Sequence, residues 1–328
     1  MIPENKKIIV ENALQSAFGV NTYDEINEMT KGLSNALTYR IVVKGRPYLL
    51  KVARTDELSL PATYYEYMKA GAEAGIAPKV WYLNSQDKIS ITDYIEHKPF
   101  PISKARVIMP KLLSKLHALP PFHKLNNNAV MDGMVQRFQA AKFTPDNLTH
   151  ELIMAYNRIN SIYPFDSSNL VSCHNDLKPE NIIFDGESAW LIDWEAAFLN
   201  DRYFDLAIIA NFVISNDEDE VQYLKTYFGK EPDEYKRAIF FLARQLLHMR
   251  YTAVFMLFAS KSVSITLDTK NDFRDFHDRI WAGEIDLAND ENKLQYALVH
   301  MNEFLSNIKT ERFENSCVLF RITNNNQS

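Results

Sequence analysis

The feature that most constrains this chain is a stretch in its middle where a polar loop lies between short apolar segments. The loop reads His-Asn-Asp-Leu-Lys-Pro-Glu-Asn from His174 to Asn181. Apolar residues on both sides of a polar centre predict two short strands that hold the loop between them. Asp185-Gly-Glu-Ser188 is a turn signal that folds the second strand back on the first, and the returning strand delivers Asp193.

The spacing of these polar residues is typical of phosphoryl transfer. His174, Asp176 and Asn181 fill the pattern H-x-D-x-x-x-x-N, and Asp193 supplies the further acid on a neighbouring strand. The carboxylate of Asp176 can orient an attacking hydroxyl and accept its proton. The amide oxygen of Asn181 and the carboxylate of Asp193 are hard ligands suited to Mg²⁺ between nucleotide phosphates. We interpret His174 as a brace for the loop rather than as a reacting group.

The same stretch resembles the catalytic loop of the kinase-like small-molecule phosphotransferases, the superfamily of the aminoglycoside phosphotransferases and the choline and ethanolamine kinases. His174-Asn-Asp176 with Asn181, followed by Asp193-Trp-Glu195, looks closest to the bacterial choline kinases. A chance placement of His, Asp and Asn in a polar loop is the alternative, and four residues in register argue against it. The resemblance implies ATP and Mg²⁺ as cofactors.

At 328 residues the chain is long enough for two lobes that share a cleft. The resemblance implies a two-lobed, protein-kinase-like α+β fold, with a small N-terminal lobe of antiparallel sheet and a helix, and a larger, mainly helical C-terminal lobe. We expect residues 1–96 to form the nucleotide-binding lobe and residues 97–328 to form the catalytic and substrate-binding lobe. The run Glu96-His-Lys-Pro99 is a natural hinge.

Composition narrows the class of partner. The formal net charge of −6 argues against a nucleic-acid surface and mildly favours cationic small molecules. Only Cys173 and Cys317 are present, without metal-ligand spacing, which fits a reducing cytosol. The N-terminus lacks a long apolar segment and no run reaches membrane-spanning length, so we expect a cytoplasmic protein without membrane insertion. No interface signal distinguishes a monomer from a homodimer.

The N-terminal lobe should contain one helix ahead of a small sheet. Apolar side chains at helical spacing predict a helix over residues 7–18 that stops near Gly19. A first strand, a loop and a second strand should follow, with the loop and the second strand within residues 29–43. Further strands are expected at residues 48–53, 77–83 and 88–95.

Two segments of this lobe are candidates for nucleotide contact. Gly32, Ser34 and Asn35 lie in a loop whose small residues let backbone N–H groups approach phosphate oxygens. A bare hairpin tip is the alternative, and the place of this loop before the lysine-bearing strand favours phosphate contact. Backbone groups around Asp93 and Ile95 should meet adenine, although no side chain there is diagnostic.

Lys51 lies in an apolar strand, where an unpaired ammonium group is unfavourable to bury. Strand alternation can point it at water instead. As a kinase-like lysine it would reach the α- and β-phosphates and pair with a glutamate on the following helix. Glu66 is the candidate partner, because Glu57 is too close to the strand and Glu73 too near the helix end.

The C-terminal lobe should be mainly helical. Helical spacing indicates helices at residues 104–119 and 151–163, from residue 217, and at residues 235–260 and 287–310. Residues 124–150 predict a loop with a short helix. Pro110 should kink the first of these helices or mark its true start. We interpret His117, near its end, as a packed core histidine rather than a ligand.

A protein substrate is disfavoured. Only 12 positions separate Asp193 from Asp205, which leaves no room for a protein-kinase activation segment, and no A-P-E element appears. Asn175 stands where protein kinases carry an arginine, so a receiver for an activating phosphate is missing. Asp205 opens an apolar helix and can be its N-cap. The resemblance implies that this acid also steadies the catalytic loop.

A quaternary or protonated amine is held by aromatic faces and a nearby carboxylate. Glu195, two residues past Asp193, is the candidate carboxylate, and the resemblance implies an acid at this place in choline kinases. Tyr203, Tyr251, Phe255 and Trp281 are candidates for the pocket wall. Packing in the core is the alternative for each aromatic side chain. The tryptophan pair expected in choline kinases on the long helix is absent, which puts choline itself in doubt and leaves a small amino alcohol plausible.

The first hypothesis is therefore an ATP-dependent kinase for the hydroxyl of a small amine, with choline or ethanolamine leading. The second is aminoglycoside phosphorylation, which would use an open pocket lined by the acids at residues 217–220 and 272–286. The third is a nucleotide-binding pseudokinase. The complete set of Lys51, Asp176, Asn181 and Asp193 argues against the third, because a binding module does not need all four.

Overall fold

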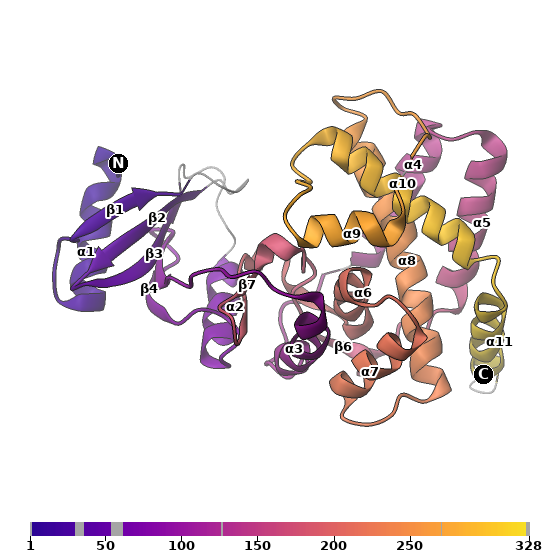
Figure 1. Ribbon diagram of the computed structural model, residues 1–328, viewed down its shortest axis with the longest axis horizontal. Helices are drawn as coiled ribbons and strands as arrows, with labels where there is room; N and C mark the ends of the chain where they lie inside the picture. Colours follow the sequence, from indigo (N-terminus) through magenta and orange to yellow (C-terminus); the bar gives the residue numbers. More distant parts are fainter. Residues whose placement is uncertain (1, 30–35, 54–61, 126, 270, 326–328) are drawn as a thin grey trace. The chain divides into compact units, whose positions relative to one another are not determined.

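The protein is described here by a computed structural model covering residues 2–29, 36–53, 62–125, 127–269 and 271–325 (Figure 1). The chain divides into two compact units. The first consists of Met1–Phe100, Ala118–His123 and Glu180–Ala197, and the second of Pro101–His117, Lys124–Pro179 and Phe198–Ser328. The first unit holds an antiparallel sheet and the second is mainly helical, so the predicted α+β class is confirmed.

The sheet of the first unit has five antiparallel strands in the order β1-β2-β3-β5-β4. The strands are β1 (Glu25–Glu28), β2 (Ala36–Val43), β3 (Arg46–Ala53), β4 (Val80–Asn84) and β5 (Ile89–Asp93). Helix α2 (Ala62–Glu73) lies between β3 and β4 in the sequence. The strands expected from the apolar segments are thus confirmed, and the first of them, ahead of the loop, is β1 at one edge of the sheet.

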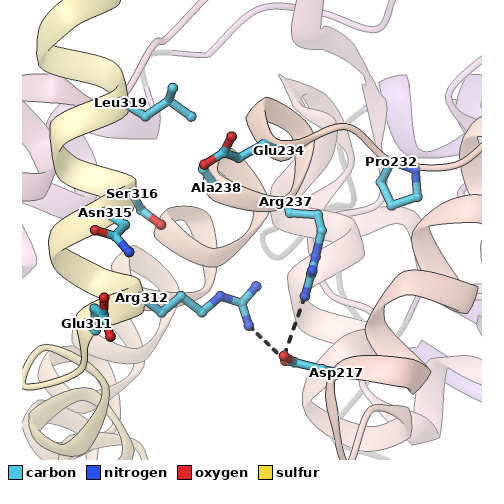
Figure 2. A pocket seen from close by; sticks show the side chains of 10 residues that line it. All are labelled: Asp217, Pro232, Glu234, Arg237, Ala238, Glu311, Arg312, Asn315, Ser316 and Leu319. Carbon is cyan, nitrogen blue, oxygen red and sulfur yellow. Dashed lines mark hydrogen bonds and ion pairs between the residues drawn. The ribbon is translucent and has the colours of Figure 1, made fainter.

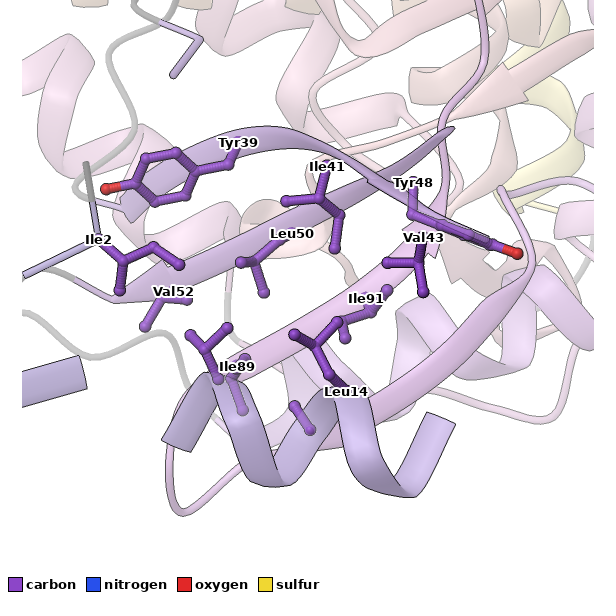
Figure 3. Packing of buried hydrophobic residues seen from close by; sticks show 12 residues of the cluster. Ile2, Leu14, Tyr39, Ile41, Val43, Tyr48, Leu50, Val52, Ile89 and Ile91 are labelled. Atoms are coloured by element: carbon purple, nitrogen blue, oxygen red, sulfur yellow. The ribbon is translucent and has the colours of Figure 1, made fainter. Parts of the chain in front are cut away.

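Helix α1 (Lys7–Phe18) packs on one face of this sheet, as Figure 1 shows. It ends at Gly19, whose φ of 71° is a conformation that glycine adopts without a steric penalty. In Figure 3, Leu14 lies close to Ile89 and Ile91 in the layer between helix and sheet. These side chains belong to one buried apolar cluster, which fixes the face of each strand that points toward α1.

The predicted turn after the polar loop is present. Strand β7 (Ile182–Phe184) pairs antiparallel with β8 (Ala189–Leu191), and Asp185 accepts hydrogen bonds from the backbone N–H groups of Glu187 and Ser188 in the turn. The strand before the loop, β6 (Leu170–Cys173), pairs instead with β9 (Phe198–Asp201). The expectation that the second strand folds back on the first is therefore wrong, because β9 satisfies the backbone groups of β6.

Nine helices are described in the second unit: α3 (Ile102–Leu116), α4 (Asn127–Ala141), α5 (Asp146–Ile162), α6 (Arg202–Val213), α7 (Asp217–Phe228), α8 (Glu234–Ala259), α9 (Phe273–Trp281), α10 (Asp290–Asn307) and α11 (Glu311–Asn325). The long helix α8 is at their centre and contacts α4, α5, α6, α10 and α11 (Figure 1). Among the described residues, no helix combines the length and apolar character needed to cross a bilayer.

Three helical expectations need correction. Residues 124–150 hold a full helix, α4, which buries Val135 and Phe138. The expected final helix is followed by another, α11, which buries Phe313, Cys317 and Phe320 at positions i, i+4 and i+7. Of the two predictions for Pro110, that it kinks the helix or marks its start, the second is wrong, because Pro110 lies inside α3.

Candidate active site

Lys51 lies on β3, on the face opposite the side chains that pack on α1. Strand alternation places Tyr48, Leu50 and Val52 in the apolar cluster and turns Lys51 the other way. This face is not open to water, because only 17% of the Lys51 side chain is exposed. The structure therefore excludes the interpretation in which Lys51 simply points into solvent.

The Lys51 ammonium group has two polar neighbours. Its Nζ atom lies 3.8 Å from Oδ1 of Asp193 and donates a hydrogen bond of 3.3 Å to the hydroxyl of Tyr64. Burial alone would lower the pKa of Lys51, while Tyr64 and Asp193 raise it above its usual value. The lysine therefore stays charged beside the predicted metal-ligating acid, as an interaction with phosphate requires.

Glu66, the predicted partner of Lys51, is not its partner in the structure. Both residues are described, and no ion pair joins them, because Glu66 lies on the exposed face of α2. Tyr64 is 3% exposed and occupies the buried face of the helix. Tyr64 is buried and Glu66 is exposed because residues two apart on a helix point about 200° away from each other.

Asn181 and Asp193 lie at the same end of the β7–β8 hairpin. The backbone N–H of Ile192 donates to the carbonyl oxygen of Asn181 at 3.0 Å, and Asp193 follows directly. Asp193 has a φ of 65°, an uncommon conformation for a residue with a side chain. Its Oδ1 atom is buried and has no hydrogen-bond partner among the described residues. A buried carboxylate oxygen at the hairpin end that also carries an asparagine fits the ligand preference of Mg²⁺.

In the second unit, the start of the catalytic loop is held by Asp205. The backbone N–H groups of His174 and Asn175 each donate to one oxygen of its carboxylate, both at 2.8 Å. Asp205 is fully buried. The implied role of steadying the loop is therefore confirmed. Its interpretation as the N-cap of α6 is wrong, because the side chain of Asp201 caps this helix by accepting from the N–H of Tyr203.

His117 supports Asp205 from α3, as a packed core histidine. Its Nε2 atom lies 3.2 Å from Asp205 and its Nδ1 atom 2.6 Å from the hydroxyl of Tyr227. With Cys173, these side chains place three potential metal-ligand atoms within 4.8 Å of one another. The Asp205 oxygens already accept hydrogen bonds from the backbone, and burial raises the pKa of the Cys173 thiol. The cluster therefore braces the loop rather than holding a metal ion.

This arrangement predicts the effect of Asp205→Asn. An amide NH₂ cannot accept from a backbone N–H, so one of the two contacts with the loop is lost and a buried donor is left unpaired. We expect stability to fall by about 1–3 kcal/mol and kcat to fall roughly tenfold or more, because the loop is displaced. Thermal unfolding and steady-state kinetics measure both effects. Asp219→Asn, which weakens an ion pair with Arg106 in the same unit, should change kcat little.

Asp176 differs from its buried neighbours in the loop. About 40% of its side chain is exposed, whereas His174 is fully buried. The accessible carboxylate suits proton transfer, and the buried imidazole suits a brace. Lys178 places its Nζ atom 3.2 Å from Asp176. Sequence reasoning gave Lys178 no role, although its place two residues after the acid in the same loop was a usable signal.

The candidate aromatic residues do not form one group. Tyr251 and Phe255 on α8 have ring centroids 5.6 Å apart, and both rings lie near Tyr296 of α10. Burial, and then the negative charge of Asp176, raise the pKa of Tyr251. Trp281 packs on Phe212 of α6 instead.

Tyr203 is only 3% exposed and packs near Phe228, so its ring is part of the core. Glu195 is exposed and follows Asp193 by two residues, as expected. Asp93 accepts a hydrogen bond of 2.7 Å from the indole of Trp81, and Ile95 is half-buried beyond the end of β5. The predicted phosphate loop, with Gly32, Ser34 and Asn35, lies outside the described residues.

The acids considered for an aminoglycoside pocket are largely paired. Figure 2 shows Arg237 and Arg312 directed at Asp217 in a pocket of about 620 Å³. The same arginines lie 3.2 and 2.5 Å from the buried Glu220. In the 272–286 segment, Asp278 pairs with Arg274 at 2.7 Å. These carboxylates are thus matched by the protein's own cations.

Comparison with known proteins gives consistent matches. The profile of the phosphotransferase enzyme family matches residues 25–240. Protein LicA of Haemophilus influenzae is 25% identical over 224 residues, which are 62% of this chain and 80% of that protein. A choline/ethanolamine kinase family protein from Mesorhizobium loti is 17% identical with a TM-score of 0.64, covering 96% and 99% of the two chains.

A spectinomycin phosphotransferase solved with ADP and spectinomycin is 16% identical with a TM-score of 0.56, covering 90% of this chain and 98% of that one. At such low identities the two structures show a shared fold and no more. The fold is nevertheless the two-lobed, kinase-like one that the catalytic stretch predicts.

Proposed function

The chain belongs to the phosphotransferase enzyme family, and from this premise we propose that it transfers the γ-phosphate of ATP to the hydroxyl of a small cationic amine, choline or ethanolamine. The observation that carries the proposal is the group at the end of the β7–β8 hairpin. There a buried oxygen of Asp193 without a hydrogen-bond partner among the described residues lies 3.8 Å from Lys51 and beside Asn181. A charged lysine next to metal-ligand oxygens is what a nucleotide triphosphate requires.

In this proposal Lys51 binds the α- and β-phosphates, while Asn181 and Asp193 would hold Mg²⁺. The ion would neutralise negative charge on the phosphates when bound. Asp176, five residues before Asn181, orients the acceptor hydroxyl and takes its proton. The acceptor oxygen forms a bond to the γ-phosphorus, the bond from that phosphorus to the bridging oxygen breaks, and ADP leaves.

The amine half of the substrate is assigned from charge and aromatic surface. Glu195 supplies an exposed carboxylate, and Tyr251 and Phe255 supply neighbouring rings for a cation. The structural relative from Mesorhizobium loti is a choline/ethanolamine kinase family protein, which agrees with this assignment. The arginine partners of Asp217 and Glu220 leave these acids less available to a polycationic antibiotic.

Aminoglycoside phosphorylation is the second candidate, favoured by the fold shared with the spectinomycin phosphotransferase. An acceptor panel separates the two. Purified protein is given Mg-ATP with choline, ethanolamine, spectinomycin and other aminoglycosides, and ADP release is followed by a coupled assay. We expect turnover with choline or ethanolamine. Turnover with antibiotics alone would support the second candidate, and none with any hydroxyl acceptor would support a pseudokinase.

We also propose that the loop of Gly32, Ser34 and Asn35 covers the phosphates and that the segment of Asp93 and Ile95 meets adenine. Residues 1–96 would then bind the nucleotide, and residues 97–328 would carry out catalysis and bind the acceptor.

A further inference from the structure

Lys51 needs a partner that holds its flexible side chain in place, and α2 supplies a tyrosine where a carboxylate was expected. We propose that Tyr64 is the positioning residue for Lys51. The inference rests on the proposed function, because it concerns how the nucleotide-binding lysine is held. It goes further, because it assigns to the neutral hydroxyl of Tyr64 the role of Lys51 partner that the sequence predicted for Glu66.

The Tyr64 hydroxyl lies in a position to hold the Lys51 ammonium group. The Lys51 Nζ atom donates to the Tyr64 hydroxyl at 3.3 Å and lies 5.3 Å from the centroid of its ring. Both contacts favour an ammonium group at this spot. Tyr64 is 3% exposed, so its ring cannot turn into solvent and release the lysine without local rearrangement.

The charge around Lys51 also favours a neutral partner on α2. Asp193 already places one carboxylate 3.8 Å from Lys51. A second buried carboxylate, from α2, would repel the carboxylate of Asp193 and compete with it for the ammonium group of Lys51. A neutral hydroxyl accepts a hydrogen bond from Lys51 without adding negative charge. The positive charge of Lys51 can then interact with Asp193 and with the phosphates.

Helix α2 also packs closely against the segment that carries Asp193. Gly71 lies seven residues after Tyr64, on the same face of the helix. A Cβ atom at Gly71 would lie 2.6 Å from Cζ2 of Trp194, the residue after Asp193. The close approach of helix and indole therefore requires glycine. One face of α2 thus contacts both Lys51 and the neighbour of Asp193, so Tyr64 fixes the lysine relative to the acid.

The test compares Tyr64→Phe with Tyr65→Phe, which removes a hydroxyl from the adjacent, equally buried tyrosine. We expect Tyr64→Phe to raise the KM for ATP and the Kd for Mg-ATP about five- to tenfold. The KM for the acceptor should stay within twofold of wild type. Tyr65→Phe should leave all three constants within twofold, and both variants should melt within about 3 °C of each other.

A double-mutant cycle with Lys51→Met excludes a general packing effect. If Tyr64 acts through Lys51, removing its hydroxyl in the Lys51→Met background should change the Kd for Mg-ATP less than twofold. Calorimetric nucleotide binding needs no acceptor, so this result stands even if the wild-type protein phosphorylates neither choline nor ethanolamine.

Several results would overturn the proposal: a wild-type Kd for Mg-ATP in Tyr64→Phe, an equal loss in Tyr65→Phe, or additive losses in the cycle. A larger rise in Kd from Glu66→Gln than from Tyr64→Phe would assign the role to Glu66 instead. A wild-type protein that binds no Mg-ATP would contradict both this inference and the proposed function.

Discussion

Replacement of Asp176 by Asn should lower kcat by about 10³-fold or more, with the Kd for Mg-ATP within a few-fold of wild type. The carboxylate is the group that accepts the proton of the acceptor hydroxyl, and an amide cannot do so. Asp176 is partly exposed and is not among the buried groups that hold the loop, so the variant should fold normally. Its loss should therefore appear in turnover and not in the melting temperature.

Single-turnover phosphate transfer and calorimetric nucleotide binding measure the two quantities separately. Glu187→Gln is a matched control, because it removes a negative charge from the exposed turn after β7. This control should keep kcat within twofold of wild type. An Asp176→Asn variant with more than a tenth of wild-type kcat would show that another group accepts the proton.

The second large expected effect is a loss of stability in mild acid. His248, His277 and His300 lie on α8, α9 and α10 and are fully buried. The ring of His300 has its centroid 5.0 Å from that of His248 and 5.1 Å from that of His277. Burial lowers the pKa of His277 to about 3 and lowers the pKa values of the other two well below the usual range.

The sign follows from where the protons bind. Below pH 6.5 the histidines of the unfolded chain take up protons, while those of the folded chain stay neutral until much lower pH. Unfolding is therefore favoured as the pH falls from 6.5 toward 3. Between pH 7.5 and 5.5 each histidine should remove about 1.4 kcal/mol from the free energy of unfolding, or about 4 kcal/mol together.

One buried acid opposes this trend. Burial raises the pKa of Asp201 to about 7, so the folded chain binds a proton there before the unfolded chain does. Protonation of Asp201 over the same pH change should therefore add about 2 kcal/mol to the free energy of unfolding. The net loss of that free energy is then on the order of 2 kcal/mol. This is a substantial share of the stability of an ordinary domain.

Urea unfolding at pH 7.5 and 5.5 measures the difference. In His277→Gln the loss between the two pH values should shrink by about 1.4 kcal/mol, even if the variant is less stable at both. His150→Gln removes an exposed histidine of α5 and should leave the difference unchanged. Equal free energies of unfolding at both pH values in the wild-type protein would show that the three imidazoles do not stay neutral.

The catalytic stretch could be predicted from the sequence because its signal is local. His174, Asp176 and Asn181 stand in a fixed spacing, and the turn that returns the chain to Asp193 has a strong turn composition. Lys51 was identified from its strand. These features depend on neighbours in the sequence and needed no knowledge of the packing.

Other features depended on tertiary contacts. The choice between Tyr64 and Glu66 is set by which face of α2 is buried, and a helix rich in tyrosine leaves that face undecided in the sequence. Strand β9 has only four residues and is defined by its pairing with β6. Helix α4 contains Gly133, which lowers the helix propensity of its sequence, and it packs on α8. The secondary structure of such segments is determined by contacts with residues that are distant in the sequence.

The most direct test of the central claim is identification of the product by ³¹P NMR after incubation with Mg-ATP and choline or ethanolamine. We expect a phosphomonoester on the amine's hydroxyl, formed in equal amount to ADP, and none above background with Asp176→Asn. Release of inorganic phosphate without an ester, or bound ATP that is transferred to no hydroxyl acceptor, would contradict it.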